Sequence, residues 1–307
     1  MNLILIMDIG FIPNTASYKN KKISFQNKIY NLRRFLERYF CRLLILLNIY
    51  PKTQFYFESN IKIVNKYKKN TLRNFILKFP LLDFLLNFKI IENINSKTFE
   101  YYKKYKLKKA KPRILFIDGN YKHGDVLERE GKVVNQNKEK YLNALRNYLQ
   151  YLKKIFKKDI YICLHPSSDL NDYKKLFPSF KINKGNTREQ IYNSSIVVFH
   201  ESSAVIDAII SKKKIISFQT ELLGKYYFNR INLYISNCDL YSIHIDKPIK
   251  DFKLSKNEIL RKLNYKNAKM NNYINQNILS DRQKIPSEKI LNVISKFIYK
   301  NEKKLLA

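Results

Sequence analysis

The sequence predicts an α/β protein whose second half contains a parallel β-sheet. Three observations favour this fold. Short and continuously apolar segments recur at residues 113–118, 160–165, 196–200 and 214–219. Segments with the apolar spacing of a helix lie between them, and five of the six glycines lie beyond residue 110. Strands that are apolar on both faces and alternate with helices are typical of βαβ units, in which helices cover both faces of a parallel sheet.

The segments between these predicted strands are expected to be helices. They cover residues 137–156, 169–177, 187–194 and 202–211. The first has the clearest pattern, because its apolar residues recur every three or four positions and so form one stripe along a helix. The members of that stripe are Tyr141, Leu142, Leu145, Tyr148, Leu149, Leu152 and Ile155.

The length and composition allow two domains. A chain of 307 residues with 45% hydrophobic residues can bury two cores. The basic segment Lys103–Lys111 is followed by Pro112 and is expected to be an exposed linker. We therefore predict an N-terminal α/β domain over residues 1–110 and a C-terminal domain over residues 111–307.

The N-terminal domain has a weaker pattern. Three strands are expected in it, at Asn2–Asp8, Gln54–Glu58 and Lys89–Asn93, together with a helix over Gln26–Ile49. The end of the chain is expected to be helical, with Ser287–Tyr299 as the last helix. These last helices are candidates to return to the first domain.

The charge balance favours a polyanionic partner. Lys and Arg total 59 against 25 Asp and Glu, a formal net charge of +34. Such an excess attracts nucleic acid, anionic lipid or sugar nucleotides. An equally weighted alternative is compositional drift, since the chain is rich in Lys and Tyr and lacks Trp. Nucleic acid is the disfavoured partner, because Lys is spread along the chain and no nucleic-acid-binding module is recognisable.

The cysteines and the N-terminus indicate a reducing, cytoplasmic location. Cys41, Cys163 and Cys238 show no CxxC spacing, which argues against a zinc site and a disulfide framework. The start, MNLILIMDIG, lacks a basic flank and a cleavage site, so we interpret it as a strand. No apolar run reaches the roughly 18 residues of a membrane span. The basic residues of Gln26–Ile49 fit either a solvated helix face or a helix at the anionic inner face of the cytoplasmic membrane.

Polar residues end four consecutive predicted strands of the C-terminal domain. The four groups are Asp118-Gly119, His165-Pro166-Ser167-Ser168, His200-Glu201-Ser202-Ser203 and Gln219-Thr220. Because ligands of open parallel sheets bind beyond the carboxyl ends of the strands, these residues predict a binding edge. Each group alone also fits a helix cap or a turn, and their recurrence is what indicates a site.

Individual residues of this edge have expected roles. Ser202 and Ser203 open the predicted helix around Ala204–Ile210 and are expected either to bind a phosphate or to cap that helix. His165, held extended by Pro166, is expected to donate to a leaving phosphate or to serve as a turn residue. Asp118 ends an apolar strand and is the preferred general base.

Further candidates lie near this edge or in the other domain. His123 and Asp125 follow Asp118 on a loop and are expected to line the same cleft, whereas Asp8 is the alternative base. His244 is expected to be structural and to lie in a loop. The sequence contains no DxD, GxGxxG, P-loop, HExxH or GxSxG motif, so neither a metal ion nor a cofactor is predicted.

The order of the strand-end motifs resembles a known family. The pairs Asp118-Gly119, His165-Pro166 and Ser202-Ser203 are similar to motifs of bacterial polysialyltransferases and lipooligosaccharide sialyltransferases. The surrounding segments resemble proteins of O-antigen and capsule gene clusters. The resemblance covers Arg113–Tyr227, which is under half of the chain. It departs at Ile117, where the family has a further acidic residue.

This resemblance implies a GT-B fold of two Rossmann-like lobes and a metal-independent glycosyltransferase. The donor would be a nucleotide-sugar whose phosphates are held by the HP and serine motifs, and the acidic residue would be the base. The acceptor would be a growing surface glycan or a lipid-linked sugar. Two alternatives stay open, a polyol-phosphate transferase of teichoic-acid-like synthesis and a non-catalytic GT-B-like or polyanion-binding protein.

Overall fold

A computed structural model describes most of the C-terminal half and shorter segments before it. The chain divides into two compact units, one made of Met1–Lys97 and Gln276–Ala307 and the other of Thr98–Asn275. The described residues are 3–7, 53–58, 61, 90–93, 97–105, 110–119, 121, 124–252, 254–263, 268–279 and 286–305.

Among the described residues, the first unit contains a three-stranded parallel sheet. Its strands are β1 (Leu3–Met7), β2 (Thr53–Glu58) and β3 (Ile90–Asn93). They lie in the order β1-β2-β3, and both pairings are parallel. All three strands were predicted from the sequence, to within one residue at each end. The predicted helix Gln26–Ile49 lies outside the described residues, as does Asp8.

Unit two contains a six-stranded sheet in which every pairing is parallel, which confirms the predicted fold class. The order is β6-β5-β4-β7-β8-β9. Counted from β4, this is the Rossmann order 3-2-1-4-5-6, which reverses between β4 and β7. The strands are β4 (Lys111–Ile117), β5 (Ile160–Leu164), β6 (Lys181–Lys184), β7 (Ser194–Phe199), β8 (Lys214–Gln219) and β9 (Tyr241–His244).

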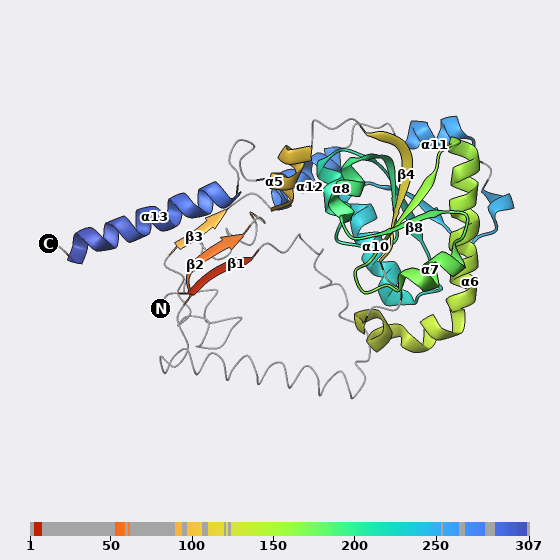
Figure 1. The fold of residues 1–307 in the computed structure, drawn as a ribbon, viewed down its shortest axis with the longest axis horizontal. Coiled ribbons are helices and arrows are strands. Elements are labelled where there is room, and N and C mark those ends of the chain that lie inside the picture. The colour runs from red at the N-terminus through yellow and green to blue at the C-terminus, as the bar shows by residue number, and fades with distance from the viewer. Residues whose placement is uncertain are drawn as a thin grey trace. The chain divides into compact units, whose positions relative to one another are not determined.

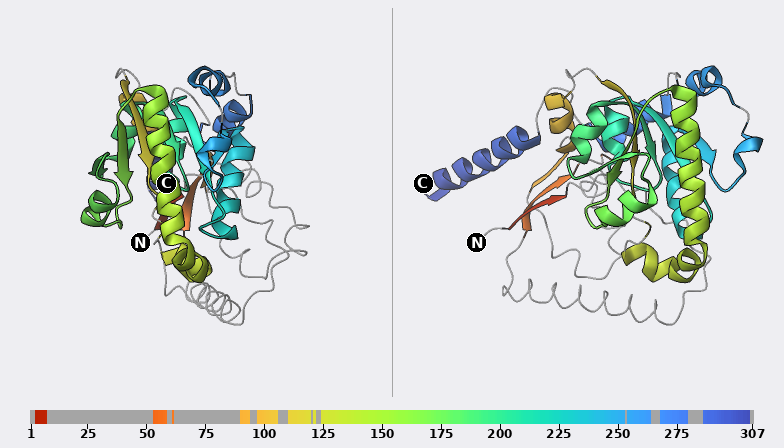
Figure 2. Two further views of the ribbon diagram at one scale, coloured as in Figure 1. Left: turned by 90° about the vertical axis from the view of Figure 1, so that its right-hand side faces the viewer. Right: turned by 45° about the vertical axis from the view of Figure 1, so that its right-hand side comes forward.

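Helices connect and cover these strands (Figure 1). The longest, α6, begins at Gly124, well before the predicted start at Asn137, and Figure 2 shows it running alongside the sheet. The described helices of the second unit are α5 (Lys97–Tyr105), α6 (Gly124–Phe156), α7 (Leu170–Leu176), α8 (Thr187–Tyr192), α9 (Val205–Ile210), α10 (Lys225–Cys238), α11 (Lys256–Leu263) and α12 (Ala268–Asn277), with a 3-10 turn at Ile249–Asp251. Helix α13 (Pro286–Leu305) belongs to the first unit.

Two predictions about the course of the chain were wrong in detail, and both edge strands of the larger sheet were missed. Part of the predicted linker Lys103–Lys111 has regular structure, because α5 extends to Tyr105 and β4 begins at Lys111. His244, expected in a loop, is the last residue of β9. The edge strand β6 was not predicted, and its four residues KINK are mostly exposed and therefore lack an apolar run.

The core of the second unit lies between the sheet and the predicted stripe of α6. Ile114 and Phe116 alternate along β4 and pack with six buried members of that stripe, whereas Ile155 is partly buried. Successive side chains of a strand point to opposite faces. Leu115 and Ile117 therefore lie on the other face, where α8 contacts β4 and β7 and α9 contacts β8. Burying each such side chain contributes roughly 1.5–3 kcal/mol.

A membrane-spanning helix is not found within the described part of the chain. None of its helices combines sufficient length with sufficient hydropathy.

Candidate functional site

The parallel strands β4 to β9 all end at one edge of the six-stranded sheet, which we call the carboxyl edge. The predicted groups of polar residues follow β4, β5, β7 and β8, and these four strands are neighbours in the order β5-β4-β7-β8. The reversal of strand order lies between β4 and β7, and open α/β sheets bind their ligands at such a point. The sheet order therefore brings the predicted residues to the position expected of a ligand site.

Gly119 follows β4 at a point where two chain segments approach closely. A Cβ atom built on Gly119 would lie 2.0 Å from the carbonyl oxygen of Glu201 and 2.6 Å from the hydroxyl oxygen of Tyr227. Neither distance leaves room for a methyl group. Glycine is therefore required here so that the segments after β4 and β7 can pack together.

Asp118 is buried and holds the loop that follows β5. Its carboxylate accepts hydrogen bonds from the Ser168 hydroxyl (2.7 Å), the Tyr173 hydroxyl (2.9 Å) and the backbone N–H of His165 (3.4 Å). The side chain is only 3% exposed. Burial, followed by the charge of Asp118, raises the pKa of Tyr173 far above its ordinary value, so this phenol stays a donor. These contacts favour a positioning role for Asp118 over the predicted role of general base.

The residues that follow β5 form the His165 loop, residues 165–169. Pro166 and Ser167 are exposed and His165 is half-buried. The Nδ1 atom of His165 accepts from the backbone N–H of Ser167 (3.2 Å) and lies 2.7 Å from its hydroxyl oxygen. Because Nδ1 accepts, this geometry assigns the proton of the neutral ring to Nε2, which becomes the donor. Lys184 Nζ ties the loop to β6 by donating to the Ser168 carbonyl (2.8 Å).

His200, at the end of β7, lies in the core. It is 1% exposed, and its ring stacks on Tyr141 at a centroid distance of 5.4 Å and lies tilted against Tyr227 at 4.7 Å. Its Nδ1 lies 2.9 Å from the Phe218 carbonyl oxygen, so Nδ1 carries the proton. Burial lowers the pKa of His200 to about 4. At neutral pH this ring is therefore uncharged, and it packs in the core next to the carboxyl edge.

Glu201, the next residue, pairs with an arginine that the sequence reasoning missed. Its carboxylate lies 2.7 Å from Arg230 Nη2 on α10, and the two side chains are 11% and 15% exposed. Arg230 also donates from Nη1 to the Tyr226 hydroxyl (3.2 Å). A lone arginine in the middle of a helix gives no sequence signal for such a pairing. Glu201 thus anchors α10 to the end of β7.

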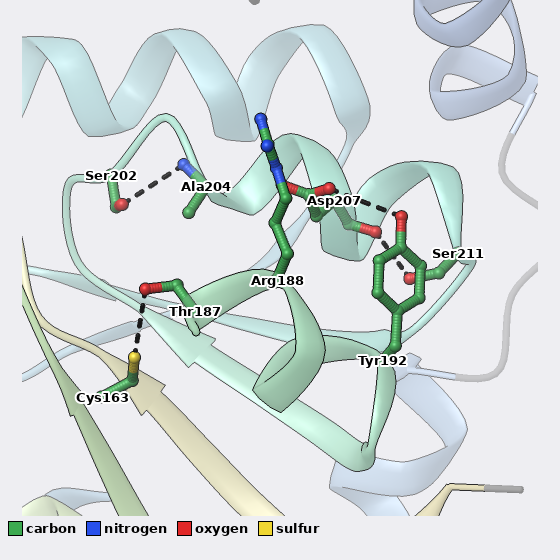
Figure 3. Close-up of polar contacts among 8 residues, drawn as sticks. All are labelled: Cys163, Thr187, Arg188, Tyr192, Ser202, Ala204, Asp207 and Ser211. Atoms are coloured by element: carbon green, nitrogen blue, oxygen red, sulfur yellow. Dashed lines mark hydrogen bonds and ion pairs between the residues drawn. The ribbon is translucent and has the colours of Figure 1, made fainter. Parts of the chain in front are cut away.

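Ser202 and Ser203 form the Ser202 turn, residues 202–204, which leads into α9. The Ser202 hydroxyl accepts from the backbone N–H of Ala204 (3.3 Å), as Figure 3 shows. Helix α9 begins at Val205, and its N-cap residue is Ala204. The Ser203 side chain is exposed. Of the two serines, Ser202 therefore has the turn-forming role and Ser203 faces solvent.

Gln219, the last residue of β8, and Thr220, which follows it, make contacts within the protein. Gln219 donates to the side chain of Asn232, and Thr220 donates to the carboxylate of Asp246. The second oxygen of Asp246 accepts from the backbone N–H of Glu221 (2.7 Å). Thr220 is fully buried. Both residues therefore fix the loop after β8.

The remaining predicted residues lie outside the described structure. This applies to Asp8, His123 and the side chain of Asp125, so their proposed roles stay predictions. Among the described residues, no group of three or more His, Cys, Asp or Glu side chains could hold a metal ion.

No protein-family model and no curated protein matches the chain, but several solved structures do. The UDP-GlcNAc 2-epimerase of Methanocaldococcus jannaschii, in complex with UDP-GlcNAc and UDP, is 14% identical with a TM-score of 0.41, over 80% of this chain and 61% of that one. The wall teichoic acid polymerase TagF, soaked with CDPG, is 14% identical with a TM-score of 0.41, over 83% and 59%. KpsC of Thermosulfurimonas dismutans, a beta Kdo 2,4 transferase, is 16% identical with a TM-score of 0.27, over 40% and 42%. The chain thus spans less than two thirds of each of these proteins, and matches at these identities concern the fold alone.

Proposed function

We propose that this chain is a metal-independent glycosyltransferase that uses a nucleotide-sugar donor and extends a cell-surface glycan. The observation that carries the proposal is the carboxyl edge, where the reversal of strand order coincides with the predicted motifs. Two units with parallel sheets in one chain fit the GT-B architecture that the sequence resemblance implies. The proposal rests on this edge and on the sequence motifs, and not on the ligands of the matched structures.

The proposed donor contacts are the accessible groups of the edge. His165 is proposed to donate from Nε2 to the leaving phosphate, because its Nδ1 is engaged by Ser167. The exposed hydroxyl of Ser203 is proposed to contact the same phosphate group. Asp118 is proposed to hold the His165 loop in place, while Asp8 remains the alternative base predicted from the sequence.

Nucleotide binding tests the proposal directly. A ligand that binds only the native state raises the free energy of unfolding, by about 2.7 kcal/mol at a concentration of 100 Kd. We expect at least one of CMP, CDP, UDP, GDP and dTDP to raise the melting temperature. His165→Ala and Ser203→Ala should each lower the affinity for that nucleotide about tenfold to a hundredfold, which is the scale of a charge-assisted hydrogen bond.

A matched control is available at the opposite edge of the sheet. Ser179 is also an exposed serine, but it precedes β6 at the amino edge. Ser179→Ala should therefore leave nucleotide affinity unchanged. If His165→Ala and Ser203→Ala both bind nucleotide with wild-type affinity, the proposed donor site is wrong.

The alternatives predicted from the sequence are separated by the product. Transfer of a polyol phosphate from a CDP-linked donor would assign teichoic-acid-like synthesis instead of sugar transfer. A chain that binds no nucleotide but retains RNA or heparin at physiological salt would be a polyanion-binding protein.

A further inference from the structure

Arg188 lies at the carboxyl edge, although no motif of the sequence assigns it a role. It is the second residue of α8, which follows the end of β6 through Gly185 and Asn186. The preceding residue, Thr187, accepts from the thiol of Cys163 at 3.3 Å, and Cys163 is the penultimate residue of β5. This contact places the start of α8 beside the end of β5, at the same edge as the His165 loop.

The Arg188 side chain is held from two sides. Its Nε donates to Asp207 Oδ2 at 3.4 Å, and its Cζ lies 4.2 Å from the centroid of the Tyr101 ring on α5. Asp207 is 3% exposed and also accepts from the Tyr192 hydroxyl at 3.4 Å. Figure 3 shows Arg188 extending from α8 toward Asp207 on α9. The guanidinium is therefore fixed by a buried acid and an aromatic face before any ligand arrives.

This arrangement leaves most of the guanidinium donors available. An arginine has five N–H donors in a planar fork. One is directed at Asp207, and within the described part of the chain the two terminal amino groups have no hydrogen-bond partner. The Arg188 side chain is 42% exposed. A guanidinium that is oriented by two contacts and keeps its amino groups open is suited to two-point recognition of a phosphate.

The partner of this guanidinium, Asp207, lies in the helix that follows the serine motif. The backbone N–H of Asp207 donates to the carbonyl oxygen of Ala204 at 3.1 Å. Asp207 therefore lies in the first turn of α9, directly after the Ser202 turn. Figure 3 shows the Ser202 turn leading into the helix that carries Asp207. Two other cations of this edge are already engaged, since Lys184 donates to Ser168 and Arg230 pairs with Glu201.

We propose that Arg188 is a phosphate-binding residue of the donor site and contacts the phosphate group of a nucleoside mono- or diphosphate. Asp207 and Tyr101 are its positioning residues. This inference deepens the proposed function and rests on it, because it assigns the anionic part of the same donor. It also brings α8 into the site, an element for which the sequence motifs gave no function.

The experiment compares Arg188→Gln and Arg188→Lys with wild type in titrations of CMP, CDP, UDP, GDP and dTDP, and in displacement of the bound nucleotide by inorganic pyrophosphate.

A matched control is Arg113→Gln. Arg113 also lies over a tyrosine, 4.5 Å from the ring of Tyr161, and donates from Nε to Ser194 at 3.0 Å, but it lies in the first half of β4. We expect Arg188→Gln to lower the affinities for nucleotide and for pyrophosphate by the same factor, about tenfold to a hundredfold. Arg188→Lys should recover part of the loss, and Arg113→Gln should change neither.

Each other outcome overturns a defined part of the argument. Unchanged nucleotide affinity in Arg188→Gln overturns this inference and leaves the proposed function standing. A wild-type chain that binds none of the nucleotides overturns both. If Arg188→Gln lowers the melting temperature of the ligand-free protein but not the affinity for pyrophosphate, the residue is structural and the inference is wrong. Should Arg188→Gln fail to fold, Arg188→Lys, which keeps the charge, decides by the same readouts.

Discussion

Removing one hydroxyl group tests whether Asp118 holds the His165 loop. The Tyr173 hydroxyl donates to Asp118 Oδ1 at 2.9 Å, while Ser168 and the His165 backbone donate to Oδ2. Tyr173→Phe removes the first donor and leaves the ring in place. The carboxylate is 3% exposed, so water has little access to replace the lost donor.

The size of the effect follows from the charge and burial of the acceptor. A hydrogen bond to a charged group contributes about 1.5–3 kcal/mol. For a domain of roughly 150–250 residues, each kcal/mol shifts the melting temperature by about 2–4 °C. Tyr173→Phe should therefore lower the melting temperature by roughly 3–12 °C. Urea unfolding followed by circular dichroism measures the corresponding change in the free energy of unfolding.

Tyr241→Phe is the matched control. The Tyr241 hydroxyl is also buried, but among the described residues it has no hydrogen-bond partner. Removing it should leave stability unchanged or slightly higher. If Tyr173→Phe is as stable as Tyr241→Phe, the proposed anchoring by Asp118 is wrong. Asp118→Asn adds a second test, since an anchor should lower stability and nucleotide affinity together. Lost turnover at wild-type stability and affinity would return Asp118 to the role of general base.

Two further predictions concern the residues beneath the edge. The pKa of His200 is about 4 in the folded chain against 6.5 ordinarily, so the unfolded chain binds more protons between these pH values. Stability should fall by up to roughly 3 kcal/mol as pH drops from 6.5 to 4, and urea unfolding of His200→Phe should show a smaller loss over that range. Gly119→Ala should lower stability by about 1–3 kcal/mol, because its Cβ would lie 2.0 Å from the Glu201 carbonyl oxygen. A wild-type melting temperature for Gly119→Ala would contradict the close approach.

Much of the second unit could be predicted from the sequence because its central strands are apolar on both faces. The runs that became β4, β5, β7 and β8 are short and bounded by polar residues, which distinguishes them from helices. The strands β6 and β9 lie at the two edges of the sheet and lack such runs. The ends of α6 and α9 were predicted to within one residue, although Lys157 and Lys212 adopt positive φ values of 49° and 51° there, where glycine is the usual signal. The start of α6 at Gly124 and the whole of α10 were missed.

The positions of the site residues could be predicted, but the directions of their side chains could not. A strand end determines which edge a residue reaches, and this was sufficient for His165 and Ser203. Whether a side chain faces solvent or the core depends on partners that are distant in the sequence. Asp118 contacts Tyr173 across 55 positions, and the nearest sequence neighbours of His200 give no indication of the Tyr141 ring. Arg188 was missed for the same reason, because its partner Asp207 lies 19 residues away.

The acidic residues of this edge share a physical role that explains why the general base is hard to assign from sequence. As whole residues, Asp118, Asp207 and Glu201 are 3%, 3% and 9% exposed. Each of these acids forms a hydrogen bond or an ion pair with another side chain of the protein. His165 and Arg188, in contrast, remain accessible to solvent. Carboxylates that faced solvent here would repel a phosphate, and burial with a bound donor avoids this. At the proposed phosphate-binding edge, we therefore expect an acid to act first as an anchor. Its loss should reduce stability and affinity together, and an acid that serves as base should reduce turnover alone.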